Sequence, residues 1–405
     1  MFNFISGGVT APQGFTASGI HCGIRKNKSK KDLALIMAST QCDAAAVYTQ
    51  NLVYGAPITV TRNNIADGKA RAIICNSGIA NTCNADGIEK AQLMCQIAAE
   101  ETGLNPTDFV VCSTGVIGQP INIDPIKAGM PQLVKELSAN GSDAAAQAIM
   151  TTDTVKKEFA LEFTLGNKPC KIGAISKGSG MIHPNMATML GFITTDANIS
   201  SAMLKSALLE VVSDSFNMLS VDGDTSTNDT VAVLASGLCG NDRIEEKNND
   251  YKDFVLALAA ICEKLVKLMA KDGEGATKLV ECFVSGAKAR ETAKSAAKAV
   301  ICSSLVKAAM FGADANWGRI LCAIGYAGVD IDVNKVDVYF KSAGGEILVC
   351  KNGAGVEFSE EKAKEILVKD EVYIIVNLND GEFSATAYGC DLTYDYVKIN
   401  GDYRT

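Results

Sequence analysis

Histidine is scarce in this chain of 405 residues, where only His21 and His183 could supply an imidazole ligand. Neither histidine has a neighbouring ligand at zinc spacing, and the 14 cysteines include no Cys-x-x-Cys pair, so we expect no metal site. The first residues also lack the basic region and the long apolar region of a secretory signal. We therefore expect a cytoplasmic protein whose cysteines are free thiols, several of them buried inside apolar runs (Cys95, Cys262, Cys282 and Cys322).

Positive charge and long apolar runs are also in short supply. The formal net charge is −8, and the one basic cluster, from Arg25 to Lys31, reads as a solvated loop, which argues against a nucleic-acid partner. The nearest candidate for a membrane span, 254–261, is too short to cross a bilayer. The sequence contains no internal repeat, low-complexity segment or proline-rich linker, so domain boundaries are poorly marked.

Segments with strand-like and helix-like patterns alternate along the chain. The range 88–101 has apolar residues at helical spacing, and 158–165 with 170–176, joined by Gly166-Asn167, predict a hairpin. The other expected strands are 71–75, 109–112, 189–194, 230–235, 277–285, 336–341, 346–350, 372–378 and 383–388, and the other expected helices begin at Asp124-Pro125 or cover 200–219, 250–271, 290–310 and 360–367. This alternation predicts an α/β protein with mixed sheets.

The segment 177–190, KGSGMIHPNMATML, carries the strongest chemical signal. Thr188 follows a small residue and precedes a predicted buried strand, which by itself fits an ordinary β-branched strand residue. A threonine hydroxyl is a weak nucleophile unless a base lies within hydrogen-bond reach. A threonine at a newly made N-terminus carries its own base, because its α-amine titrates near pH 8. Cleavage between Ala187 and Thr188 would therefore create a nucleophile and its base in one step.

This segment closely resembles the self-cleavage and active-site segment of the ArgJ family, the ornithine acetyltransferases of arginine biosynthesis. Four further matches appear in the family's order: 112–118 (CSTGVIG), 272–278 (DGEGATK), 314–319 (DANWGR) and the tail 396–405 (YVKINGDYRT). The resemblance implies an amino-terminal-nucleophile enzyme that cuts itself into an alpha chain, 1–187, and a beta chain, 188–405. It also implies a DmpA-like sandwich of stacked mixed β-sheets flanked by helices, with a smaller C-terminal α/β domain at roughly 290–390.

The resemblance assigns roles to individual residues. Thr188 is then the nucleophile of both cleavage and turnover, and the Thr114 hydroxyl with the Gly115 N–H forms the oxyanion hole. The remaining implied substrate contacts are Thr152, Lys177, Glu274, Asn400 and Thr405. Without the resemblance, the same residues fit a strand-to-turn connection, a helix cap, surface charges and a frayed chain end.

Two more segments match the family without an assigned role. The run 76–81 departs from the family's usual pattern at Ile79, which leaves the lining of the acetyl pocket open. The acidic loop 222–229 has the spacing of a calcium loop but lacks its terminal glutamate, so we interpret it as a structural turn beside the site.

By resemblance, the reaction is a ping-pong acetyl transfer. The Thr188 hydroxyl attacks the acetyl carbonyl of N2-acetylornithine with its own α-amine as base, ornithine leaves, and glutamate removes the acetyl group as N-acetylglutamate. No cofactor is expected. The sequence leaves open whether acetyl-CoA is a second acetyl donor, and we favour this bifunctional type. The family also implies that the alpha and beta chains associate, as a heterotetramer of two of each, with no nucleic-acid or membrane partner.

Three other functions are weighed against this one. A self-processing aminopeptidase or amidase of the DmpA fold would pass the acyl group to water, but such enzymes typically have serine after the cut. A Ser–His hydrolase built on Ser179 and His183 lacks a Gly-x-Ser-x-Gly elbow after a strand. A non-catalytic binding protein with the same fold would not need Thr188.

Overall fold

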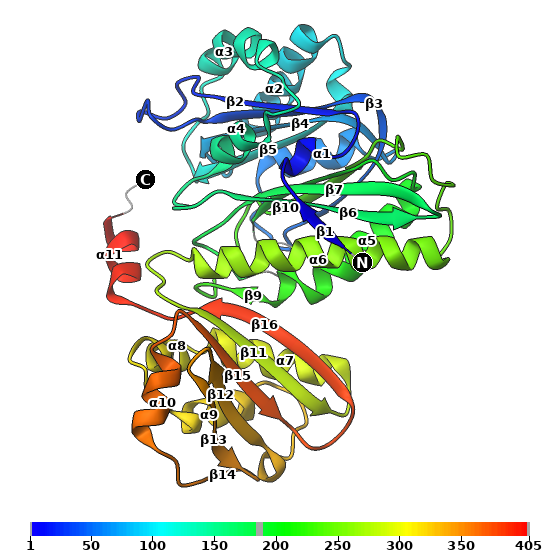
Figure 1. Ribbon diagram of the computed structural model, residues 1–405. Coiled ribbons are helices and arrows are strands. Elements are labelled where there is room, and N and C mark those ends of the chain that lie inside the picture. Colours follow the sequence, from blue (N-terminus) through cyan, green and yellow to red (C-terminus); the bar gives the residue numbers. More distant parts are fainter. Residues whose placement is uncertain (1, 184–188, 403–405) are drawn as a thin grey trace.

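The computed structural model describes residues 2–183 and 189–402 as a mixed α/β protein with two mixed sheets (Figure 1). The first sheet has nine strands in the order β1-β6-β7-β8-β10-β3-β4-β5, with β2 added on β3. Its strands are β1 (Asn3–Ile5), β2 (Phe15–Ile20), β3 (Leu33–Tyr48), β4 (Lys69–Ile79), β5 (Phe109–Val116), β6 (Lys157–Leu165), β7 (Lys168–Lys177), β8 (Leu190–Thr195) and β10 (Thr230–Ala235). The predicted fold class of stacked sheets flanked by helices is confirmed.

The long strand β3 connects two halves of the first sheet. Its first part pairs with β2 and β4, its last part pairs with β10, and the β3–β4 register is interrupted between Met37 and Cys42. The two halves face each other, because Ile36 of β3 shares one buried cluster with Ile175 of β7 and Phe192 of β8. This arrangement brings the ends of β5 and β7 together, although these strands are far apart in the strand order.

Helices cover both outer faces of this sandwich and fill its middle. Helices α1 (Ala56–Asn64), α2 (Gly87–Thr102) and α3 (Asp124–Lys135) pack on the β4–β5 half, and α4 (Ser142–Ile149) lies between the halves. Helices α5 (Ser201–Asp214) and α6 (Asn249–Lys271) cover the β6–β7 half. In α6, buried Phe254, Leu258 and Ile261 form an apolar stripe at helical spacing, which explains why this helix was predicted almost to its ends.

The second sheet has seven strands in the order β14-β13-β12-β15-β11-β16-β9. Its strands are β9 (Leu219–Ser220), β11 (Leu279–Ala287), β12 (Asp337–Ser342), β13 (Gly345–Lys351), β14 (Ala354–Gly355), β15 (Glu371–Asn377) and β16 (Phe383–Cys390); its helices are α7 (Arg290–Cys302), α8 (Ser304–Phe311), α9 (Trp317–Gly325) and α10 (Glu360–Leu367). Helix α6 packs on both sheets and lies between them in Figure 1. The chain division at Ala187 and the bounds 290–390 of a smaller domain stay predictions.

Two predicted helices end earlier than expected. Helix α5 stops at Asp214 because Ser215 leaves the helical region (φ −119°, ψ −88°), and its hydroxyl donates to the carbonyl of Val211 at 2.6 Å. The range 290–310 is two helices, α7 and α8, because Ser303 is extended and its hydroxyl accepts from the N–H of Val306 at 3.3 Å. Hydrogen bonds from serine side chains to the backbone end a helix locally. The apolar periodicity of the sequence continues past both serines, and for this reason longer helices were predicted.

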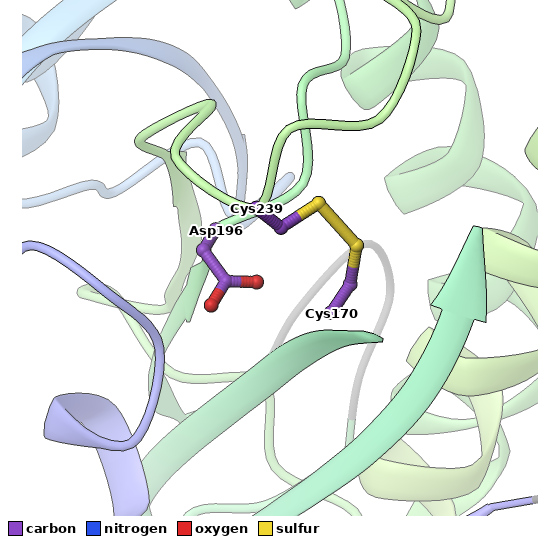
Figure 2. A group of neighbouring side chains, drawn as sticks. All are labelled: Cys170, Asp196 and Cys239. Atoms are coloured by element: carbon purple, nitrogen blue, oxygen red, sulfur yellow. A yellow bond between two sulfur atoms is a disulfide. The ribbon is translucent and has the colours of Figure 1, made fainter. Parts of the chain in front are cut away.

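The expectation of free thiols is wrong for one cysteine pair. Cys170, near the start of β7, and Cys239, after β10, form a disulfide although 69 residues separate them (Figure 2). The loop after β10 folds back so that the N–H of Cys239 donates to the carbonyl of Asp196 at 2.8 Å, and this brings the two Cα atoms within 5.4 Å. A tertiary contact of this kind has no signature in sequence spacing. Cys322, expected to be buried, is exposed on α9.

Candidate active site

The carboxyl ends of β5 and β7 place Thr114 and Lys177 side by side. The Lys177 ammonium donates a hydrogen bond to the Thr114 hydroxyl at 3.4 Å, and both residues are buried. The next residue, Gly115, has φ +131°, and a Cβ there would lie 2.3 Å from the backbone carbon of Gly78. Only glycine fits this close approach of β4 and β5. The turn therefore holds a hydroxyl, a backbone N–H and a cation within one small region.

Hydrogen bonds fix this turn from behind. The Ser113 hydroxyl donates to the side-chain oxygen of Asn76 at 2.6 Å, and the Asn76 amide donates to the carbonyl of Ile79 at 2.9 Å. The Asn228 amide donates to the carbonyls of Ser113 at 3.0 Å and Ala80 at 2.6 Å. The segment 76–81 and the acidic loop thus support the turn from β4 and from the loop before β10. These bonds hold the turn at Thr114 and Gly115 in one conformation. A tetrahedral oxyanion requires hydrogen-bond donors that are fixed in this way.

A second group of expected substrate contacts gathers around Ser179 and Gly180. The hydroxyls of Thr152 and Ser179 are 2.7 Å apart, and the N–H of Glu274 donates to the carbonyl of Ser179 at 2.8 Å. A Cβ on Gly180 would lie 2.3 Å from the carboxyl carbon of Glu274, so this glycine lets the carboxylate lie directly on the backbone. Helix α11 (Tyr394–Asp402) brings the amide of Asn400 to the Glu274 carboxylate at 2.8 Å.

A buried ion cluster ties these segments together. The ammonium of Lys157 lies 2.7 Å from the Asp153 carboxylate and 2.6 Å from the Asp272 carboxylate, and its side chain is fully buried. Asp153 also accepts from the N–H of Gly178 at 2.7 Å. Burial favours a raised pKa for Asp153, but the ammonium groups of Lys157 and Lys177 outweigh it and hold that pKa well below the ordinary value. Residues next to Thr152, Lys177 and Glu274 therefore meet in one charged cluster.

The proposed cleavage point itself lies outside the described residues, as do Ala187, Thr188 and Thr405. The chain before it is held by the acidic loop: the Asp222 carboxylate accepts from the N–H groups of Met181 at 2.6 Å and Ile182 at 2.8 Å. The Thr225 hydroxyl donates to the carbonyl of His183 at 2.8 Å. The interpretation of 222–229 as a structural turn beside the site agrees with these contacts.

The Ser179–His183 pair of the rival hydrolase is not formed. The Ser179 hydroxyl is engaged by Thr152, whereas Nδ1 of His183 lies 3.2 Å from the Ser220 hydroxyl and 3.4 Å from the Cys302 sulfur. Burial, reinforced by the nearby Lys298 ammonium, lowers the pKa of His183 to about 4. Without a hydrogen bond to Ser179, this imidazole does not activate it as a nucleophile.

Hollows of different size surround the site. Next to Thr114 and Lys177 is a cavity of about 20 Å³, which Gly178, Gly180, Leu190 and Asp229 also line. A cavity of about 440 Å³ lies beside Thr152, and its rim includes Arg25, Lys30 and Lys31 of the basic cluster. This cluster is more than a solvated loop, because the Lys31 ammonium donates to the carbonyl of Gly19 at 2.6 Å and the Arg25 guanidinium donates to the carbonyl of Met150.

Cys170, Asp196 and Cys239 form the one group whose ligand atoms are close enough to hold a metal ion among residues 2–183 and 189–402 (Figure 2). Both sulfurs belong to the disulfide. The Asp196 carboxylate accepts from the N–H groups of Gln13 at 3.0 Å and Lys171 at 2.7 Å. The two sulfur atoms are thus bonded to each other, and both carboxylate oxygens of Asp196 accept hydrogen bonds from the backbone. Among the same residues, no helix combines the length and apolar character of a membrane span.

Sequence reasoning missed several residues that shape the site. Asn228 and Asp229 lie inside a recognised segment without a role of their own, and Ser179 has a role only in the rival hydrolase. Lys157, next to Lys156 and just before the expected strand 158–165, carries no sequence signal of a buried ion cluster. Asp153 could have been suspected, because it directly follows Thr151-Thr152. Asp229 could have been suspected as a carboxylate entering an apolar strand.

Comparison with known proteins agrees with the geometry. The model of the ArgJ family matches residues 16–405. The arginine biosynthesis bifunctional protein ArgJ of Caldanaerobacter subterraneus is 49% identical over 402 residues, 99% of each chain, and that of Bacillus subtilis is 47% identical over 403 residues, 99% of this chain and 97% of the relative. A crystal structure of ArgJ from Bacillus halodurans is 48% identical with a TM-score of 0.51 and covers 53% of this chain and 100% of that one. The chain belongs to the ArgJ family.

Proposed function

We propose that this protein is an acetyltransferase of arginine biosynthesis that moves the acetyl group of N2-acetylornithine to glutamate. The observation that carries the proposal is the match to the ArgJ family over 16–405, combined with the pairing of Lys177 with Thr114 at the ends of β7 and β5. The relatives carry names that place them in arginine biosynthesis. The site offers a backbone N–H, a hydroxyl and a cation for a developing oxyanion.

The reaction proceeds through an acetyl ester on Thr188. The Thr188 hydroxyl attacks the acetyl carbonyl while its α-amine takes the proton, and the negative charge forms next to Thr114 and Gly115. The proton then passes to the nitrogen of ornithine as the carbon–nitrogen bond breaks. Glutamate enters, its amine attacks the ester, and N-acetylglutamate leaves with the Thr188 hydroxyl restored.

The substrates share an α-amino-acid head, and the second group of residues suits it. The Glu274 carboxylate can pair with a substrate ammonium, and the Thr152 hydroxyl and the Asn400 amide can hydrogen-bond the head; Thr405 completes this set. Water must be excluded from the ester for transfer to win over hydrolysis. A site closed to water is therefore part of this proposal, and the cavity that Thr114 and Asp229 line measures about 20 Å³.

Self-cleavage between Ala187 and Thr188 creates the nucleophile. The Bacillus halodurans chain supports this step by its length, since all of that chain covers only 53% of the present one. The fragment 188–405 would comprise 218 of the 405 residues, which is nearly the same share. The contacts of Asp222 and Thr225 hold the backbone of residues 181–183, which come before the cut in the chain.

The two fragments stay associated after the cut. Strand β7 of the first fragment pairs with β8 of the second from Ile172–Thr195 to Lys177–Leu190, and β3 pairs with β10. We propose a cytoplasmic assembly of two alpha and two beta chains, which light scattering at several protein concentrations would test. No cofactor is required. Acetyl-CoA serves as a second donor in this proposal, which an assay with acetyl-CoA and glutamate alone would test.

Replacement of the nucleophile tests the function. The Thr188→Ala variant is expected to remain one chain and to lose acetyl transfer from N2-acetylornithine to glutamate. Thr195→Ala, a change at a buried threonine of β8, should keep it. Transfer that survives in Thr188→Ala would overturn the proposal. Hydrolysis of acetylornithine by the wild type without transfer to glutamate would favour the DmpA-like amidase instead.

A further inference from the structure

The cavity of about 440 Å³ lies between the loop that joins β2 to β3 and the chain that follows α4. Its volume falls within the range of about 300–1,000 Å³ that is typical of clefts for drug-sized ligands. Three cations of the loop line it: Arg25, Lys30 and Lys31. They gather here although the net charge of the whole chain is −8. These three cations have no part in the transfer from N2-acetylornithine to glutamate as proposed above.

A buried carboxylate holds the loop in one conformation. The Asp32 side chain is fully buried. Its carboxylate accepts from the N–H groups of Cys22 at 2.7 Å, Gly23 at 3.3 Å and Arg25 at 3.0 Å. A loop that is ordered in advance loses less conformational entropy on binding a ligand than a mobile loop does. The backbone that carries the basic side chains is therefore prepared for binding.

The two lysines of this loop keep donors for a ligand. An ammonium has three N–H donors. Among the residues that the structure describes, Lys30 makes one hydrogen bond, to the carbonyl of Thr151 at 3.4 Å. Lys31 also makes one, to the carbonyl of Gly19 at 2.6 Å. Each ammonium can therefore donate further hydrogen bonds to an anion in the cavity.

Another part of the cavity wall belongs to the candidate active site. Thr152 lines the cavity, and its hydroxyl lies 2.7 Å from that of Ser179. Asp153 also lines it, and the Lys157 ammonium at 2.7 Å compensates the charge of this carboxylate. Asp153 accepts from the N–H of Gly178, which lines the 20 Å³ cavity. Hydrogen-bonded residues thus connect the walls of the two cavities, and the larger cavity keeps an excess of positive charge.

We propose that the larger cavity binds the phosphate groups of a phosphorylated acetyl donor, acetyl-CoA. This inference rests on the proposed function, in which acetyl-CoA is the second donor. Phosphate groups carry several negative charges, and lysine and arginine are the side chains that bind them. The single side-chain carboxylate of glutamate does not require three cations. The acetyl group of acetyl-CoA is attached to a long flexible arm, so phosphates bound beside Thr152 are compatible with a thioester in the active site.

Calorimetric titration with coenzyme A measures this binding without turnover. The wild type should bind coenzyme A and also adenosine bisphosphate, the phosphorylated end of that molecule. Pantetheine, which has the flexible arm but no phosphate, should bind about tenfold more weakly than coenzyme A or not at all. Lys30→Gln should raise the Kd of coenzyme A about three- to tenfold, and the charge reversal Lys30→Glu should raise it further. Lys30 is exposed, so neither change disturbs the core.

Lys28 provides the matched control, because it belongs to the same loop, is exposed and does not line the cavity. Lys28→Gln and Lys28→Glu change the net charge of the protein by the same amounts as the Lys30 variants. Their Kd values for coenzyme A should stay within about twofold of the wild type at physiological ionic strength, where charges are screened beyond about 8 Å.

Transfer assays with each donor separate phosphate binding from a general effect on the active site. With acetyl-CoA as donor to glutamate, Lys30→Glu should raise the KM for acetyl-CoA by about the same factor as the Kd, with kcat nearly unchanged. With N2-acetylornithine as donor, kcat and both KM values should match the wild type, since this substrate has no phosphate.

Three results would overturn the inference. One is a Kd of coenzyme A that Lys30→Glu leaves unchanged. Another is a wild type that transfers acetyl groups from N2-acetylornithine to glutamate but does not bind coenzyme A. The third is a raised KM for glutamate in Lys30→Glu with N2-acetylornithine as donor, because the cavity would then bind the glutamate side chain. A wild type that binds coenzyme A but transfers no acetyl group from either donor would instead overturn the proposed function itself.

Discussion

The Lys177 ammonium lies 3.4 Å from the Thr114 hydroxyl although 63 residues and several intervening strands separate the two. The contact exists because the first sheet doubles over along β3, so that the ends of β5 and β7 meet. The Thr114 hydroxyl accepts from the Lys177 ammonium, so its own proton can be donated to a substrate oxygen. A hydroxyl donor beside a cation stabilises a developing negative charge.

Removing the Thr114 hydroxyl should slow acetyl transfer without unfolding the protein. Loss of one oxyanion donor typically lowers kcat by about 10²- to 10³-fold, and Thr114→Ala should show a loss of this size. Thr114→Ser keeps the hydroxyl and serves as the control, with kcat within about tenfold of the wild type. Equal activity of Thr114→Ala and the wild type in a steady-state assay would show that this hydroxyl takes no part in the reaction.

The Lys157 cluster should dominate the local stability of the site. Removing one partner of a buried ion pair leaves an uncompensated charge and costs about 3–5 kcal/mol, so Lys157→Met should lower the free energy of unfolding by this amount. The neighbouring Lys156 pairs with Asp143 and Glu158 at the surface, and Lys156→Met should cost at most about 1 kcal/mol. Urea unfolding measures both. Similar losses in the two variants would contradict the assigned role of burial.

Asp153 should make this stability depend on pH in one direction. Because its pKa is lower in the folded protein than the roughly 3.9 of an unfolded aspartate, its contribution is complete above that value and is lost as the pH falls toward the folded pKa. The difference in unfolding free energy between the wild type and Asp153→Asn should therefore be constant from pH 8 to about pH 5 and shrink below about pH 4. A difference that grows on acidification would show that the carboxylate is not stabilised in the native state.

The sequence predicted the elements and residues whose signals are local. Helix α10 has the predicted bounds, and in the structure the Ser359 side chain caps its start by accepting from the N–H of Lys362. The β6–β7 hairpin followed from Gly166-Asn167, both of which have positive φ. Thr114, Lys177, Thr152, Glu274 and Asn400 came from family resemblance, and the structure brings them together in two adjoining groups. Nothing local indicated β3 as the strand on which the sheet doubles over. The burial of Lys157 and Asp229 depends on strands distant in sequence, so no periodicity could reveal it.

The Cys170–Cys239 disulfide should hide self-cleavage on a non-reducing gel. The two cysteines lie on opposite sides of the proposed cut, so the oxidised fragments remain joined. Protein treated with glutathione disulfide, which accepts the two electrons of the thiols, and then alkylated should run as one band without reductant and as two bands with it. Cys170→Ala should give two bands in both conditions. Two bands from oxidised wild type without reductant would show that this pair does not cross-link the fragments.

The proposed mechanism requires the new N-terminus that cleavage before Thr188 would create. Purified wild-type protein, fully reduced, should be analysed by intact mass spectrometry, with acetyl transfer measured on the same sample. We expect two polypeptides, the second beginning at Thr188, and transfer in proportion to the cleaved fraction. A sample that consists of the uncut 405-residue chain and is nevertheless fully active would contradict the account.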